Sequence, residues 1–228
     1  MTANDTRVRA CIFDAYGTLF DVNAAARQLS AEIGPGWAQL AETWRAKQLN
    51  YTWLRSLMGQ HADFEQVTGE ALDFALAAQG IHNPGLRQRL MQLYVKLEAF
   101  PEAPGLLRRL KAAGLTTGIL SNGSPSMLEA ACTSAGIDSL LDHVISIEEA
   151  GIYKPDMRVY KLVTDRLGLS PDEVAFHSSN GWDAHGAKCF GFRVLWINRA
   201  GQPKEVLPHA PDHELKSLDD VPAILGIA

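Results

Sequence analysis

Short apolar runs that end in polar residues recur along the chain and alternate with helical patterns. The run from Val8 to Phe13 stops at Asp14, and the run from Leu115 to Leu120 ends in Ser121 and Asn122. Such runs predict buried strands of a parallel sheet, because strands covered on both faces need no polar alternation. The same pattern predicts further strands at Val144 to Ile147, Val174 to Phe176 and Val194 to Ile197.

Helical segments with recognisable ends lie between these runs. Ser124 and Pro125 predict the start of a helix that ends near Gly136, because a serine cap followed by proline is a common helix start. Asp156 caps another helix, which ends at Gly168. A third helix is predicted through Leu106, Leu107 and Leu110 to Gly114. This alternation predicts an α/β fold, a doubly wound, Rossmann-like parallel sheet with helices on both faces.

Residues 22–99 differ from the rest, because they contain several helical patterns and no convincing strand. Asn83 and Pro84 predict one helix start. We therefore expect an all-helical cap subdomain at 22–99, inserted into an α/β core made of residues 1–21 and 100–228. The cap would lie over the strand ends. One of its helix faces is predicted to carry Leu49, Trp53 and Leu57, which recur at intervals of four.

Composition excludes several classes of protein. The 26 acidic residues outnumber the 21 basic ones, for a net charge of −5, which argues against a nucleic-acid partner. The sequence shows no signal-peptide core and no apolar run of about 18 residues, so we expect a cytoplasmic protein without a membrane partner. Cys11, Cys132 and Cys189 form neither a disulfide framework nor a zinc motif, and we expect all three to be buried.

Polar residues follow four of the predicted strands, at the edge where open α/β sheets bind ligands. Each residue alone is consistent with an ordinary cap or turn. Acids, an amine and hydroxyls that converge on one edge instead predict an active site. These residues are Asp14 and Thr18, then Ser121 and Asn122, then Lys154, and finally Ser178, Asn180 and Asp183.

Five longer strings surround these positions. They are DAYGT at 14–18, WRAKQL at 44–49, SNGSP at 121–125, YKPD at 153–156 and SSNGWD at 178–183. Together they resemble the L-2-haloacid dehalogenases of the haloacid dehalogenase superfamily. The resemblance covers nearly the whole chain. It implies hydrolysis of short-chain L-2-haloacids to D-2-hydroxy acids and halide, with inversion at C2, through an ester on Asp14 and with no metal or cofactor.

The resemblance also implies a role for individual residues. Asp14 would be the nucleophile, and Asp183 would position or deprotonate the water that opens the ester. Lys154, Thr18, Ser178 and Asn180 would supply the charge and hydrogen bonds around Asp14. Arg45 and Asn122 would receive the halide, and Ser121 with the N–H groups near Ala15 and Tyr16 would bind the substrate carboxylate. The alkyl chain would contact Tyr16, Leu49, Phe64 and Trp182, and Tyr160 is a further candidate for substrate binding.

Arg45 has two interpretations. Its position on a helix alone favours a surface arginine whose stem packs along the apolar face. The resemblance instead favours a lid arginine that reaches the halide. Because the net charge of the chain repels an anionic substrate at long range, we expect local positive charge from Arg45 and Lys154 to attract it.

Tyr16 separates the main hypothesis from a phosphatase. Phosphatases of the superfamily carry a second aspartate at this position, which protonates the leaving alcohol, whereas a halide needs no proton. The alternatives are a related hydrolase that acts on fluoroacetate or a small-ring amino acid, a phosphatase, and a non-catalytic binding module. The resemblance also implies a homodimer. We expect His177 to be a packed core residue, and His209 and His213 to lie in a surface loop.

Overall fold

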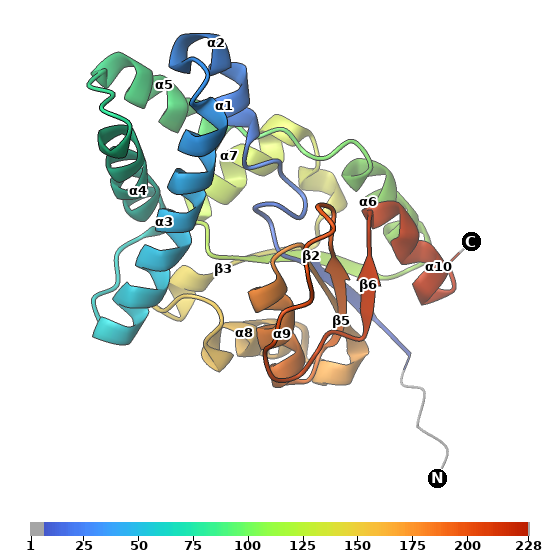
Figure 1. Ribbon diagram of the computed structural model, residues 1–228. Coiled ribbons are helices and arrows are strands. Elements are labelled where there is room, and N and C mark those ends of the chain that lie inside the picture. Colours follow the sequence, from blue (N-terminus) through green and yellow to red (C-terminus); the bar gives the residue numbers. More distant parts are fainter. Residues whose placement is uncertain (1–6, 228) are drawn as a thin grey trace.

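The computed structural model describes residues 7–227, which are built around one six-stranded parallel sheet (Figure 1). The strand order is β3-β2-β1-β4-β5-β6. Phe13 at the end of β1 pairs with Ile119 of β2 and with His177 of β4, so these three strands end at one edge. The strands are β1 (Ala10–Phe13), β2 (Thr116–Ser121), β3 (His143–Ser146), β4 (Val174–Ser178), β5 (Arg193–Ile197) and β6 (His213–Leu215).

Five of these strands agree with the apolar runs in the sequence, and the doubly wound parallel sheet is confirmed. The sixth, β6, was not predicted, because two of its three residues are exposed and polar. It is a short edge strand, and among residues 7–227 its one strand partner is β5. The prediction that His213 lies in a loop is therefore wrong, whereas His209 does lie in the preceding loop.

Helices cover both faces of the sheet. The connections through α6 (Ala103–Ala112) and α7 (Pro125–Ala135) run from β1 towards β3, and those through α8 (Met157–Leu167) and α9 (Gly181–Phe190) run the other way. Because crossovers between parallel strands are right-handed, the two pairs lie on opposite faces (Figure 1). Short elements complete this part: η1 (Asp138–Leu140), η2 (Ile147–Glu149), η3 (Pro171–Glu173), η4 (Leu218–Asp220) and α10 (Val221–Leu225).

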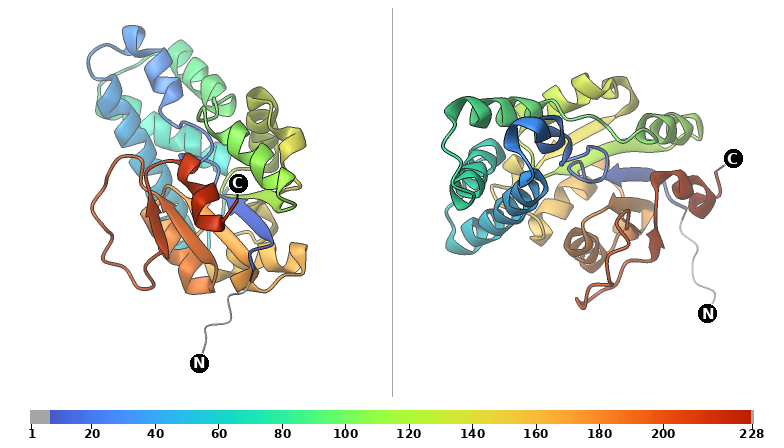
Figure 2. Two further views of the ribbon diagram at one scale, coloured as in Figure 1. Left: turned by 90° about the vertical axis from the view of Figure 1, so that its right-hand side faces the viewer. Right: turned by 45° about the horizontal axis from the view of Figure 1, so that its top comes forward.

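A group of five helices, here called the cap, follows β1. Figure 2 shows the cap gathered at one side of the sheet and its flanking helices. The two connections to it run side by side, because Asp21 N–H donates to the carbonyl of Glu98 and Phe100 N–H donates to that of Leu19. The cap helices are α1 (Ala24–Gln28), α2 (Ser30–Ile33), α3 (Trp37–Met58), α4 (Phe64–Ala78) and α5 (Pro84–Val95).

The helix predicted from the spacing of Leu49, Trp53 and Leu57 is confirmed as part of α3, but this apolar face is not the buried one. Leu57 is 85% exposed, and Leu49 and Trp53 are only half-buried. The buried stripe of α3 instead includes Trp44, Gln48 and Thr52, so the helix packs against α4 through polar as well as apolar side chains. The helix start at Asn83 is confirmed, since its side chain accepts a hydrogen bond from the backbone N–H of Leu86.

Two further expectations concern the burial of the three cysteines and the absence of a membrane span. Cys11 and Cys132 are buried free thiols as expected, but Cys189 is exposed, because it lies on the outer side of α9. Within residues 7–227, no helix has both the length and the apolar composition needed to cross a membrane.

Candidate active site

Three charged side chains form the centre of the polar edge, and we call them the charge cluster. Lys154 Nζ lies 3.1 Å from Asp14 Oδ1 and 3.0 Å from Asp183 Oδ2. All three residues are buried. Asp14 follows β1, Lys154 follows β3 and η2, and Asp183 lies in the first turn of α9 after β4. The site therefore lies at the point where the strand order reverses, between β1 and β4.

Burial and charge act in opposite directions on these groups. Burial alone would lower the pKa of Lys154, but the carboxylates of Asp14 and Asp183 outweigh it and raise that pKa. Burial raises the pKa of Asp183, and the nearby ammonium of Lys154 opposes this effect. We conclude that Lys154 is a permanent cation whose charge is offset by its two neighbours.

The second carboxylate oxygen of Asp14 accepts two neutral hydrogen bonds. Asn180 Nδ2 donates to Oδ2 at 2.8 Å, and Thr18 Oγ1 donates to it at 3.2 Å. Thr18 is itself fixed, because its hydroxyl oxygen accepts the backbone N–H of Ser179 at 2.8 Å. The carboxylate of Asp14 is thus held in one orientation from both sides.

Ser178 contributes indirectly to this arrangement. Its Oγ accepts the backbone N–H of Asn180 at 3.2 Å and so shapes the turn that carries the Asn180 amide. Tyr160 also acts through a neighbour, since its hydroxyl donates to Asp183 Oδ1 at 2.7 Å. Tyr160 is fully buried and meets the ring of Phe176 edge-to-face, so it supports Asp183 from the core side.

Arg45 reaches this edge from the cap. Its Nη2 donates to Asn180 Oδ1 at 3.2 Å and to the backbone carbonyl of Tyr16 at 3.3 Å. Its Nη1 donates to Gln48 Oε1 at 2.8 Å. Within residues 7–227 no carboxylate lies within ion-pair distance of Arg45. The side chain therefore points into the site, and the surface-arginine interpretation is wrong.

The end of β2 adds two further side chains. Ser121 and Asn122 are both buried. Ser121 Oγ accepts the backbone N–H of Gly123 at 3.1 Å, and Asn122 Oδ1 accepts that of Lys154 at 3.2 Å. With its oxygen engaged, Asn122 presents its amide NH₂ as the group that can donate to a ligand.

Aromatic rings from both parts of the molecule meet beside these polar groups. The ring of Tyr16 lies 5.4 Å from that of Phe64 and stacks on that of Tyr94 at 5.6 Å. Trp182 meets Trp53 edge-to-face at 5.3 Å. Burial raises the pKa of Tyr16 well above its usual value, so its phenol stays neutral.

Two further predicted site residues lie next to these groups in the sequence. Leu49 is half-buried on α3, the helix that carries Arg45, and Ala15 is fully buried beside Asp14.

The sequence did not single out Gln48, Thr68 or Tyr94. The available signals were the spacing of Gln48, three positions after Arg45 on one helix, and its place in the string WRAKQL at 44–49. Gln48 Nε2 also donates to Thr68 Oγ1 at 2.7 Å and lies 3.1 Å from the hydroxyl of Tyr94.

His177 is the packed core residue that was expected, since its ring stacks on that of Phe13 at 4.3 Å and its Nδ1 contacts the carbonyl of Ile12.

The donor set fits an ammonium better than a metal ion. Lys154 Nζ lies between the two carboxylates and donates to both. Within the described residues, no group of three potential metal ligands comes together.

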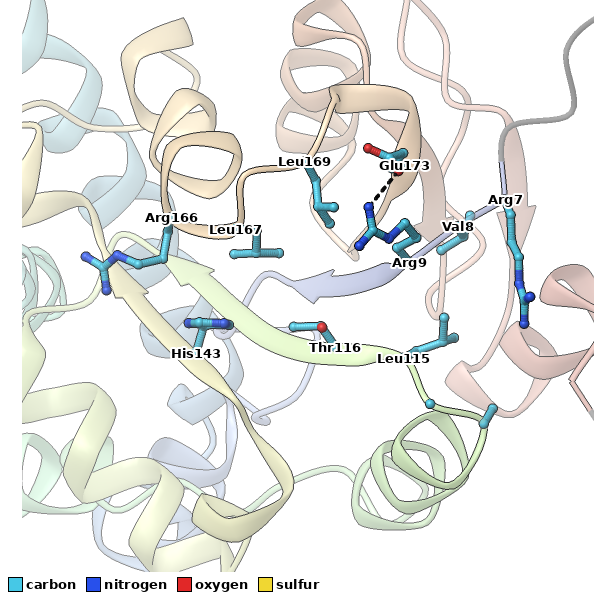
Figure 3. A pocket seen from close by; sticks show the side chains of 12 residues that line it. Arg7, Val8, Arg9, Leu115, Thr116, His143, Arg166, Leu167, Leu169 and Glu173 are labelled. Atoms are coloured by element: carbon cyan, nitrogen blue, oxygen red, sulfur yellow. Dashed lines mark hydrogen bonds and ion pairs between the residues drawn. The ribbon is translucent and has the colours of Figure 1, made fainter.

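A hollow of about 660 Å³ lies at the opposite edge of the sheet (Figure 3). It is lined by the chain leading into β1 and β2 and by the end of α8, including Arg9, Thr116 and Leu167. Arg9 pairs there with Glu173 rather than facing an open site. None of the predicted site residues lines this hollow, so it is separate from the candidate active site.

Known proteins are similar to this chain in both sequence and structure. The family model for haloacid dehalogenase-like hydrolases matches residues 8–191. The chain is 48% identical, over 96% of each chain, to the protein named (S)-2-haloacid dehalogenase 1 of Pseudomonas sp. (strain CBS-3). A crystal structure described as a dehalogenase with intermediate complex matches with a TM-score of 0.95 and 44% identity, covering 97% of this chain and 98% of the other.

A further structural relative holds a covalently bound ligand. It is the L-2-haloacid dehalogenase from Xanthobacter autotrophicus with chloropropionic acid covalently bound. The TM-score is 0.90 at 37% identity, and the match covers 96% of this chain and 98% of that one.

Proposed function

The chain belongs to the haloacid dehalogenase-like hydrolases, and from that premise we propose that it is a hydrolytic dehalogenase of L-2-haloacids. Its products are a D-2-hydroxy acid and a halide ion. The observation that carries the proposal is the Asp14 carboxylate, oriented by Lys154, Asn180 and Thr18, with the neutral phenol of Tyr16 in place of a second acid.

In the first step, a carboxylate oxygen of Asp14 attacks C2 of the substrate from the side opposite the halogen. The C2–halogen bond breaks, its electron pair leaves with the halide, and C2 inverts. Lys154 and Asn180 hold the carboxylate in line for this attack, and such positioning lowers the barrier to reaction. Arg45 and the amide of Asn122 stabilise the negative charge that develops on the halide.

In the second step, water attacks the ester carbonyl carbon of Asp14. Asp183 accepts a proton from this water, and the ester oxygen attached to C2 leaves as the hydroxyl group of the product once it is protonated. Tyr160 and Lys154 fix the two oxygens of Asp183. The Asp14 carboxylate is thereby regenerated with one oxygen from water.

Substrate binding divides between polar and apolar groups. The hydroxyl of Ser121 and the N–H groups near Ala15 and Tyr16 bind the carboxylate of the haloacid. The aromatic and aliphatic side chains of Tyr16, Leu49, Phe64 and Trp182 surround its short alkyl chain.

Halide release from the two enantiomers of 2-chloropropionate tests this function directly. We expect chloride from the L enantiomer only, together with D-lactate. In a single turnover in H₂¹⁸O with enzyme in excess, the label should enter Asp14. Label found only in the lactate would exclude the ester route. Phosphate release from simple phosphate esters that depends on Mg²⁺, with no chloride release, would overturn the proposal.

We also propose that residues 22–99 act as the cap subdomain and the rest of the chain as the core, and that two copies of the chain associate. Exposed apolar side chains support association, since such patches mark contact surfaces. Leu57 and Met58 on α3 are 85% and 62% exposed, beside a groove of about 460 Å³ that Tyr51 and Leu54 line. Sedimentation velocity should give a dimer, and Leu57→Glu with Met58→Glu should give a monomer.

A cytoplasmic location is the remaining proposal. The three free thiols of Cys11, Cys132 and Cys189 support it, because reducing compartments keep cysteines unpaired. Fractionation of cells that express the chain checks this, and enrichment in an oxidising compartment would contradict it.

A further inference from the structure

Three neutral polar side chains from three cap helices meet behind Arg45, and we call them the amide cluster: Gln48 of α3, Thr68 of α4 and Tyr94 of α5. Each is at most 3% exposed. Buried polar groups are expensive unless they are satisfied, so a cluster of this kind needs a reason. Outside the cluster, Thr68 Oγ1 contacts the backbone carbonyl of Phe64, and Gln48 Oε1 contacts Arg45 Nη1.

The cluster has a fixed hydrogen-bond direction. The backbone carbonyl of Phe64 can only accept, so Thr68 Oγ1, at 2.6 Å, must donate to it. Thr68 then has only its lone pairs left and accepts from Gln48 Nε2 at 2.7 Å. The amide nitrogen of Gln48 therefore faces Thr68, and its oxygen must face Arg45.

This arrangement holds Arg45 without neutralising it. The three acceptors of its guanidinium are Gln48 Oε1, Asn180 Oδ1 and the carbonyl of Tyr16, and all are uncharged. A carboxylate in the place of Gln48 would hold the arginine equally well but would cancel its charge. Neutral acceptors instead leave the full charge for an anion in the site.

We propose that Gln48 is a positioning residue for Arg45 and that Thr68, assisted by Tyr94, sets the orientation of its amide. The inference rests on the proposed function, because it takes the departing halide as the anion that Arg45 meets. Tyr94 supports the amide from the side, with its hydroxyl 3.1 Å from Gln48 Nε2 and 3.2 Å from Gln48 Oε1.

The leaving group provides a readout that a purely structural role would not change. Chloride leaves less readily than bromide and carries its charge in a smaller volume, so its departure depends more on a well-placed guanidinium. A poorly positioned Arg45 should therefore slow the chloride substrate more than the bromide substrate. A general loss of folded enzyme would slow both equally.

The test compares Thr68→Val with Thr68→Ser, using L-2-chloropropionate and L-2-bromopropionate. Valine keeps the shape and removes the hydroxyl, whereas serine restores it. We expect Thr68→Val to lower kcat about 10-fold for chloride and about 3-fold for bromide, with KM changed less than about 2-fold. Thr68→Ser should stay close to the wild type for both substrates.

Two further variants show whether the effect passes through Arg45. In an Arg45→Lys background, Thr68→Val should cause no additional loss, because residues that act through one group are not additive. Thr52→Val is the matched control, since Thr52 is also buried on α3 but its hydroxyl bonds only the carbonyl of Leu49. It should leave the chloride-to-bromide ratio unchanged.

Gln48→Met should give the same selective loss in a larger form. If that variant does not fold, the threonine pair still decides the question. Equal losses of Thr68→Val on both substrates, or no loss, would overturn the inference while leaving the proposed function intact. A wild-type enzyme that releases no halide from either substrate would overturn the proposed function, and this inference with it.

Discussion

The charge cluster of the core and the amide cluster of the cap differ in the charge of the groups that hold a cation in place. Each holds one cation in a buried setting: Lys154 in the core and Arg45 in the cap. Lys154 Nζ lies 3.1 Å from a carboxylate oxygen of Asp14 and 3.0 Å from one of Asp183, and these two negative charges balance its positive charge. Arg45 instead donates to three uncharged acceptors, on Gln48, Tyr16 and Asn180.

The difference explains why we propose Arg45, rather than Lys154, as the cation that contacts an anionic substrate. From the sequence, both Arg45 and Lys154 were expected to attract the substrate. The contacts leave Lys154 as an orienting group for Asp14, while Arg45 keeps its charge for the ligand. A fixed nucleophile suits strand ends, and an uncompensated cation suits a cap helix beside the proposed ligand site.

The largest expected effect comes from removing the nucleophile of the charge cluster. Asp14→Asn should lower halide release by about 10⁴-fold or more, because an amide cannot form the ester. Circular dichroism should show that the fold persists. Full activity in this variant would refute the assignment of the nucleophile and the comparison built on it.

The next effect concerns stability. Lys154→Met leaves two buried carboxylates without their cation, and we expect the free energy of unfolding to fall by about 3 to 5 kcal/mol. Gln48→Met removes an uncharged side chain together with its hydrogen bonds, one of them from Arg45, and should cost about 1 to 3 kcal/mol. Urea unfolding measures both. Equal losses would show that the two clusters do not differ energetically as their charges suggest.

Acid should weaken the core more than the cap. Burial lowers the pKa of His177 from 6.5 to about 4. Between pH 6.5 and about 4, His177 is protonated in the unfolded chain but not in the folded chain. The free energy of unfolding therefore falls as the pH drops through this range, by up to about 3 kcal/mol. His177→Phe should flatten this part of the urea-unfolding profile. An unchanged slope would remove His177 as its cause.

The smallest effect should come from the cation of the cap. Arg45→Lys keeps the charge but loses the planar fork that contacts both Gln48 and Asn180. We expect kcat for L-2-chloropropionate to fall about 30-fold, with stability changed by less than about 1 kcal/mol. Unchanged halide release would return Arg45 to a structural role.

Local patterns in the sequence predicted most of the core. Short apolar runs that stop at a polar residue identified five strands, and with them the convergence of Asp14, Lys154 and Asp183. The strand β6 was missed because its residues are mostly polar and depend on β5 for their only strand partner. Cys189 was misplaced because composition does not say which side of a helix faces the core.

The amide cluster could not be predicted, for a different reason. Gln48 lies 20 positions from Thr68 and 46 from Tyr94 in the sequence, and each is an ordinary helical residue by itself. Their meeting depends on how three helices pack. The apolar spacing of Leu49, Trp53 and Leu57 even indicated the wrong buried face, because the true one carries polar groups that pair with each other.

Asn180 links the cap to the nucleophile through the two ends of one amide. Its oxygen accepts from Arg45 at 3.2 Å, and its nitrogen donates to Asp14 at 2.8 Å. If Arg45 were displaced, the amide would lose one of these anchors and Asp14 would lose a firmly held donor. The reactivity of Asp14 would thus depend on a cap side chain that acts on it through Asn180.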